Sequence, residues 1–115
     1  MGYRSKVIIG VKSGELSKDF DGILRKHNFP VDTANTEYLK IIDDPNHMKV
    51  YQFEQIKWYE MEGWCKEIMD WVHEASEDDD NAFCVGIAYD DGVIHSEVGA
   101  YWDYVDVIQD INLIN

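Results

Sequence analysis

The stretch WYEMEGWCKEIMDWVHEASEDDDN, residues 58–81, decides how the rest of the chain is expected to fold. Apolar side chains recur in it at steps of three and four, a spacing that places them on one face of an α-helix. The predicted apolar face consists of Met61, Trp64, Cys65, Ile68, Trp71, Val72 and Ala75. The opposite face consists of Glu67, Asp70, Glu74 and Glu77, and it is followed by Asp78, Asp79 and Asp80. We therefore expect an amphipathic helix that covers a sheet and directs its acids to solvent.

A second helix and several strand-like runs surround this stretch. The second helix has Leu16, Phe20, Ile23, Leu24 and His27 on one face, with Ser13 as its N-cap and its end at Asn28 and Pro30. Strand-like runs occupy residues 3–12, 36–42, 48–56, 83–89, 93–100 and 105–113, the last as a single strand. The order β-α-β-β-α-β plus one or two strands predicts an α+β two-layer sandwich. Its sheet is mostly antiparallel and is covered by the two amphipathic helices, a variant of the ferredoxin-like arrangement.

Length and composition indicate one globular domain. The 115 residues, of which 45% are hydrophobic and 13% aromatic, suffice for a single core and argue against disorder. No apolar run approaches the roughly 20 residues of a membrane span. The opening MGYRSKVIIG has neither the apolar stretch nor the cleavage site of a signal peptide. We expect a cytoplasmic protein that does not bind membranes.

The net charge of −13 is divided very unevenly along the chain. Residues 1–57 carry nine basic and eight acidic side chains, a net charge of +1. Residues 58–115 carry Lys66 and fifteen acids, a net charge of −14. Such a field repels nucleic-acid phosphates and attracts basic proteins. Direct binding of nucleic acid is therefore not expected, and a basic protein surface is the expected partner.

The sequence points to no cofactor and no metal. Cys65 and Cys84 stand among apolar neighbours outside any CxxC pair, so both are expected to be reduced and buried. The acids near residues 78–80 and 90–91 do not have the spacing of a calcium loop. The four histidines form no i, i+4 pair that would suit zinc.

Catalytic motifs are also absent from the sequence, and no catalytic residue is assigned. There is no nucleophile elbow and no phosphate-binding glycine loop. His95 with Asp90 or Asp91 could form an acid–base pair across a hairpin if a pocket existed. Tyr101 and Trp102 follow a glycine in an expected surface loop, and aromatic residues there are typical of interface anchors.

A resemblance to a known group rests on three features: the opening MGYRSKV, the segment IKWYE before the helix, and the closing strands. In these features the chain resembles small uncharacterised proteins encoded by tailed phages and prophages. The resemblance implies expression in a bacterial host, and it assigns no activity and no site residues. Small acidic phage proteins often block host defence nucleases, including CRISPR effectors, by occupying nucleic-acid channels.

These features together lead to one functional expectation with two alternatives. The expected function is that of a non-enzymatic inhibitor that presents a nucleic-acid-mimicking acidic face to a host nucleic-acid-binding defence complex. Its binding residues would be Glu67, Asp70, Glu74, Glu77, Asp78, Asp79 and Asp80, with Tyr101 and Trp102 as anchors. The first alternative is a small-ligand-binding or hydrolytic enzyme with an acidic cleft at His95 and Asp91. The second is a phage assembly component that pairs exposed sheet edges between copies.

Overall fold

The computed structural model describes residues 4–29, 39–43, 47–56, 63–77, 81–88, 94–99, 105–107 and 111–113. Its elements in chain order are β1 (Ser5–Lys12), α1 (Glu15–Lys26), β2 (Leu39–Asp43), β3 (Met48–Ile56), α2 (Gly63–Ser76), β4 (Ala82–Ala88), β5 (Ile94–Val98), β6 (Val105–Val107) and β7 (Ile111–Leu113). This order confirms the predicted β-α-β-β-α-β core with further strands behind it.

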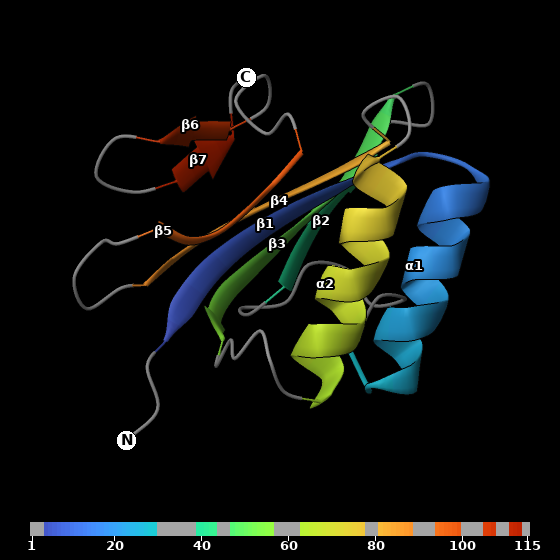
Figure 1. Cartoon of the computed structure of the whole chain (residues 1–115), viewed down its shortest axis with the longest axis horizontal. Coiled ribbons are helices and arrows are strands. Elements are labelled where there is room, and N and C mark those ends of the chain that lie inside the picture. Colours follow the sequence, from blue (N-terminus) through green and yellow to red (C-terminus); the bar gives the residue numbers. More distant parts are fainter. Residues whose placement is uncertain are drawn as a thin grey trace.

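Five strands form one antiparallel sheet in the order β2-β3-β1-β4-β5. Strand β3 lies between β1 and β2, which are joined through α1, so the first four strands form the split β-α-β arrangement of ferredoxin-like folds. Both helices cover the same face of the sheet (Figure 1). The α+β class with two helices on an antiparallel sheet is therefore confirmed.

The main core lies between the helices and the sheet. Alternate residues of the strands face the helices because successive side chains of a strand point to opposite faces. The fully buried residues of this core include Val7, Ile9 and Val11 of β1, Tyr51 of β3, Cys84 of β4, Phe20 and Leu24 of α1, and Ile68 and Val72 of α2. The apolar periodicity of the sequence thus becomes one continuous interior.

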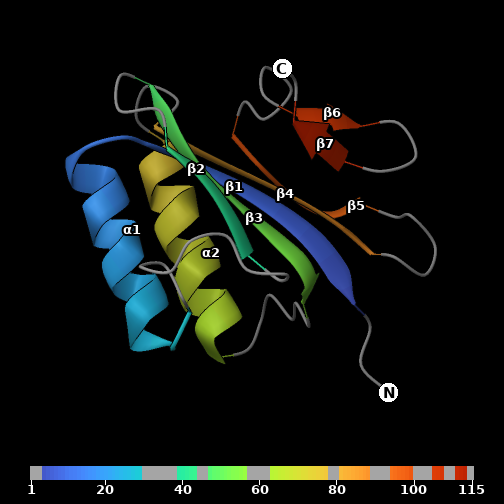
Figure 2. The same ribbon diagram turned by 180° about the vertical axis from the view of Figure 1, so that it is seen from behind.

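The opposite face of the sheet carries a second apolar cluster. Ile8, Phe83 and Val85 are buried there, although both helices lie on the other side. The β6–β7 hairpin lies on this side, where β7 contacts β4 (Figures 1 and 2). The prediction of a single strand over residues 105–113 is wrong, because β6 and β7 are separate strands that pair antiparallel. The hairpin adds a small third layer to the two that the sequence predicted.

One glycine of β1 is required by the packing on this second face. A side-chain carbon at Gly10 would lie 2.0 Å from the ring of Phe83, which crosses the strand at that point. Because real contacts of this kind never come so close, any larger residue would displace the ring. The close approach therefore explains a glycine in the middle of a central strand.

The start of α1 differs in detail from the prediction. Gly14, with φ of 121°, occupies the N-cap position that was assigned to Ser13. The Ser17 hydroxyl accepts a hydrogen bond from the Gly14 N–H at 3.1 Å and donates one to the Gly14 carbonyl at 2.9 Å. The Ser13 hydroxyl instead donates to Asp43 of β2 at 3.3 Å. Glycine occupies the cap because the chain turns there through a positive φ.

Candidate functional site

Helix α2 is held to the sheet by an apolar face. Cys65, Ile68, Met69 and Val72 are buried, and Trp64, Trp71 and Ala75 pack against the same core. The two tryptophans therefore belong to the packing of the helix, as the periodicity predicted. Met69 was missed as a member of this face, although it is one residue from Ile68 and four from Cys65. Met61, the remaining predicted member, lies outside the described residues.

Glu67 lies at the seam between the two helices. Both carboxylate oxygens accept a hydrogen bond from the Lys26 ammonium, each at 3.1 Å. One of them, Oε1, also lies 2.7 Å from His27 Nε2. The hydrogen bond with His27 and then the contact with Lys26 hold the pKa of Glu67 below its ordinary value. The sequence placed Glu67 with the outward acids. In the structure its charge is shared with the end of α1, so it contributes less to the field that α2 presents.

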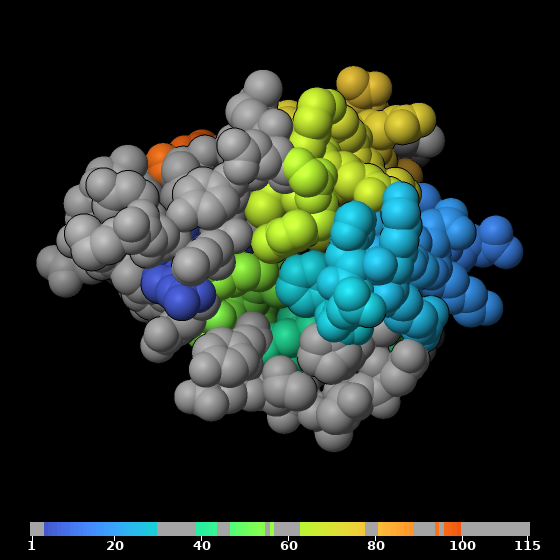
Figure 3. All heavy atoms as spheres, turned by 90° about the horizontal axis from the view of Figure 1, so that it is seen from below, coloured from blue at the N-terminus to red at the C-terminus, as the bar shows by residue number. Residues whose placement is uncertain are grey.

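The other described acids of α2 face solvent. Asp70 accepts a hydrogen bond from Lys66 at 2.6 Å, an i, i+4 ion pair in which both side chains are more than half exposed. Glu74 of α2 is exposed, and so is Glu77, which follows Ser76, the last residue of the helix. Figure 3 shows that α2 and α1 lie against each other to form one surface. Asp70 and Glu74 are therefore exposed acids of this helix layer, and Glu77 is exposed directly after it.

The remaining predicted site residues cannot be placed relative to α2. Asp78, Asp79, Asp80, Tyr101 and Trp102 lie outside the described residues. The same holds for Asp90 and Asp91 of the alternative acid–base pair, whose histidine, His95, belongs to β5. The described part of the chain therefore brings together only the helical members of the predicted acidic face.

The two halves of the sequence supply different elements of the fold. The nearly neutral residues 1–57 supply β1, β2, β3 and α1, whereas the strongly acidic residues 58–115 supply α2, β4 and β5. In the sheet β2, β3 and β1 are consecutive, and β4 and β5 follow them on one side. Helix α2 packs on β4 and β5, which belong to the same half of the chain. Elements α2, β4 and β5 therefore lie together on one side of the described sandwich.

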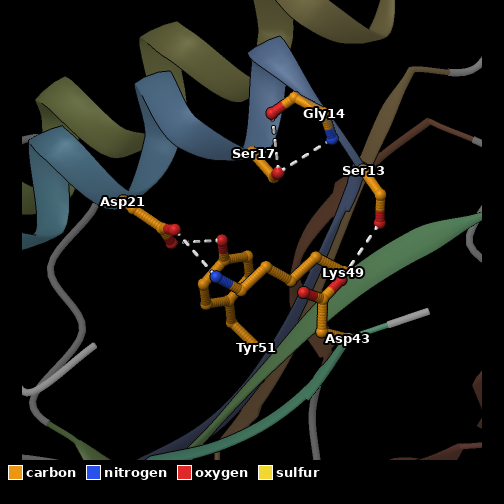
Figure 4. A network of polar contacts seen from close by, with 7 residues as sticks. All are labelled: Ser13, Gly14, Ser17, Asp21, Asp43, Lys49 and Tyr51. Atoms are coloured by element: carbon orange, nitrogen blue, oxygen red, sulfur yellow. Dashed lines mark hydrogen bonds and ion pairs between the residues drawn. The ribbon is translucent and has the colours of Figure 1, made fainter. Parts of the chain in front are cut away.

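A buried polar network joins α1 to β3, and the sequence analysis missed it (Figure 4). The Asp21 carboxylate lies 2.7 Å from the Lys49 ammonium and accepts a hydrogen bond of 2.5 Å from the Tyr51 hydroxyl. Burial, and then the hydrogen bond to Asp21, raises the pKa of Tyr51 far above its ordinary value, so the phenol is neutral. Asp21 lies three residues before Leu24 and one after Phe20. An acid beside these apolar residues could have indicated a buried carboxylate.

The two cysteines are free and buried, as predicted. The Cys84 thiol lies 3.8 Å from the sulfur of Met69, inside the core between β4 and α2. Within the described residues no group of three or more His, Cys, Asp or Glu side chains is arranged to hold a metal ion. No helix in this part of the chain is long and apolar enough to cross a membrane.

Comparisons with known proteins add no further assignment. No protein-family model matches the chain, and no curated protein or solved structure matches it significantly. The functional argument therefore depends on the geometry and charge of the chain itself.

Proposed function

We propose that this chain is a non-enzymatic binding protein that docks the acidic side of its helix layer onto a basic protein surface. The observation that carries the proposal is the exposure of Asp70 and Glu74 on a helix whose other face is buried in the core, and of Glu77 directly after that helix. Because the apolar face holds α2 in place, the acids are presented on a rigid element.

The placement of the acids suits long-range attraction. Asp70 and Glu74 are four residues apart, which is about 6 Å along a helix and comparable with the roughly 7 Å of helix axis that two phosphate steps of one DNA strand cover. Asp70, Glu74 and Glu77 belong to residues 58–115, the strongly acidic half of the sequence. A field of this kind accelerates association with a basic surface and weakens as salt is added.

The partner that fits best is a nucleic-acid-binding protein of a bacterial host, because such proteins carry basic channels that accept a line of negative charge. The resemblance to small phage-encoded proteins makes a defence complex, including a CRISPR effector, the specific class that we propose. Inhibition would follow from occupation of the channel, without any chemical step. Asp78, Asp79 and Asp80, which follow α2 in sequence, would extend the line of charge.

The experiment compares two variants with the same change in net charge. Glu74→Lys/Glu77→Lys, the α2 variant, reverses one acid of α2 and the acid directly after it. Glu15→Lys/Asp19→Lys, the α1 variant, reverses two exposed acids of α1. Each tagged protein is used for capture from a bacterial lysate at several salt concentrations. The captured proteins are identified, and their binding to DNA is measured with and without added wild-type protein.

The proposal predicts that the wild type captures a basic nucleic-acid-binding protein at low salt and reduces its binding to DNA. The α2 variant is expected to lose this capture, and the α1 variant is expected to retain most of it. Equal loss in both variants would show that net charge, not the α2 face, is responsible. Capture that is unchanged in the α2 variant would refute the proposal outright.

A further inference from the structure

The position of α1 on the sheet is fixed at both ends of the helix. Only two residues connect β1 to α1, and the N–H of the first, Ser13, donates a hydrogen bond of 3.0 Å to the carbonyl of His47, directly before β3. After the helix, the ring centroid of Phe29 lies 5.4 Å from that of Phe53 and 5.1 Å from that of Trp64. The middle of α1 is therefore held in one place above β3.

The middle of α1 presents the Asp21 carboxylate to two side chains of β3. Its Oδ2 lies 2.7 Å from Lys49 Nζ, and its Oδ1 accepts a hydrogen bond of 2.5 Å from the Tyr51 hydroxyl. This contact places Lys49 Nζ about 3.5 Å from the Asp21 carboxyl carbon, a separation from which a nucleophile can begin its attack. The fold thus holds an amine beside an acyl carbon and a hydrogen-bond donor on the acyl oxygen.

Burial of this ion pair favours its conversion into a neutral group. The side chains of Asp21 and Lys49 are only 10% and 14% exposed, so both charges have lost most of their hydration. Their mutual attraction repays that loss only in part, whereas an amide carries no charge to be hydrated. The Lys66–Asp70 pair is equally close, at 2.6 Å, but both of its side chains are more than half exposed. Burial therefore distinguishes the first pair from the second.

We propose that Lys49 and Asp21 condense to an isopeptide bond that joins β3 to α1 covalently. One proton passes from the Lys49 ammonium to Asp21 Oδ2, and the amine attacks the carboxyl carbon. The neutral Tyr51 hydroxyl stabilises the negative charge that develops on Oδ1. A second proton passes from the nitrogen to Oδ2, the bond between the carbon and Oδ2 breaks, and one water leaves. An ammonium and a carboxylate become an amide and water, with net charge unchanged and no oxidant or cofactor required.

The reaction is expected to be slow, because the resting ion pair must pass a proton before the nitrogen can attack. Freshly made protein therefore contains the ion pair that the structure shows, and the amide accumulates on storage. The proposal goes beyond the proposed function and does not depend on it, because the bond forms within the free chain.

The intact mass of the full chain tests the proposal. Cell-free synthesis sets a starting time, and samples of the folded protein are then denatured and weighed by mass spectrometry at intervals. The wild type is expected to lose the mass of one water. Trypsin should then release residues 19–25 joined to residues 41–57, because it does not cleave after a modified Lys49. A wild-type mass that stays at its starting value after days of storage would overturn the proposal.

Lys49→Arg is the decisive variant, because arginine keeps the charge and the hydrogen bonding to Asp21 but its guanidinium is not acylated. This variant is expected to fold and to keep its full mass. Loss of water that persists in Lys49→Arg would overturn the proposal, since it would come from a succinimide at Asp21–Gly22.

Two further variants separate the buried pair from its surroundings. Lys66→Met removes the lysine of the exposed pair and should lose water at the wild-type rate. Full mass in Lys66→Met would assign the reaction to the exposed pair and overturn the proposal. Tyr51→Phe removes the donor on the acyl oxygen and should lose water about a hundredfold more slowly. An unchanged rate in Tyr51→Phe would overturn the role assigned to the phenol.

Discussion

Helices α1 and α2 lie side by side on the same sheet face, yet they are held there by different interactions. The buried residues of α2 are all apolar, and its outward charges are mostly of one sign. Helix α1 buries Asp21 and Ser17 together with Phe20 and Leu24. Its exposed charges are of both signs. The comparison suggests a division of roles in which α1 is positioned by directional polar contacts and α2, held by packing, is left to present charge.

The largest expected effect comes from removing the side chain of Phe20, a residue of α1 that contacts both α2 and the sheet. Phe20 is fully buried, with ring centroids 5.0 Å from Tyr51 and 5.1 Å from Trp71. Phe20→Ala should lower the free energy of unfolding by about 3–5 kcal/mol, because it leaves a cavity between α1, α2 and β3. Urea denaturation measures the change. A loss below about 1 kcal/mol would show that the helices are not joined through this ring.

The second prediction compares one carboxylate on each helix. Asp21→Asn keeps the shape of the side chain but leaves the Lys49 ammonium without a counter-charge, which should lower the free energy of unfolding by about 1–3 kcal/mol. Asp70→Asn removes an exposed ion pair and should change it by less than about 0.5 kcal/mol. Thermal unfolding of the two variants gives the comparison. Equal losses of unfolding free energy in the two variants would contradict the conclusion that polar contacts hold α1 but not α2.

The third prediction concerns the contact between the helices. The pKa of Glu67 is held below its ordinary value of 4.5, so the stability that it contributes is fully present above about pH 4.5 and is lost as the pH falls through the lowered pKa. The difference in urea midpoint between wild type and Glu67→Gln should therefore be largest near neutral pH and disappear in acid. In a Lys26→Met background the pH dependence should be smaller. A difference that is constant with pH would contradict the assigned contacts.

The fourth prediction is a modest gain in stability in Glu74→Lys/Glu77→Lys. Acids near the C-terminal end of a helix oppose its dipole, so their reversal should raise the free energy of unfolding by about 0.3–1 kcal/mol per residue at low salt. The same variant is expected to lose its partner. Denaturation at low and high salt, measured beside the capture experiment, separates the two properties. A loss of stability would mean that these acids serve the fold and not a binding surface.

Much of the fold was predictable because it follows from local spacing. The steps of three and four in residues 58–81 predicted a helix and its buried face, and the structure has this helix at Gly63–Ser76. Alternation predicted the strands of the sheet. The N-cap at Gly14 was missed because serine is the commoner cap, and only the positive φ of the turn requires glycine. Residues 105–113 were read as one strand because the alternation of Val105, Val107, Ile111 and Leu113 is the same in one strand and in the hairpin that the structure forms.

The candidate site was predictable only in part. The acids of α2 could be named from the sequence, since their spacing alone places them away from the apolar face. The contacts of Glu67 with Lys26 and His27 could not be deduced from the sequence. Those residues are about forty positions away, and they approach Glu67 only because α1 and α2 pack side by side on the sheet. The Asp21–Lys49 contact was hidden for the same reason, because an acid at the edge of an apolar face gives no indication of its partner.

The sequence by itself determined the α+β class, the two amphipathic helices and the concentration of acid in residues 58–115. These properties depend on periodicity and composition, which are local. The tertiary structure decided the strand order and the hairpin over the second sheet face. It also decided which charges are buried in pairs and which remain outward. Those outcomes depend on contacts between residues far apart in the chain, and such contacts exist only once the sheet has brought the segments together.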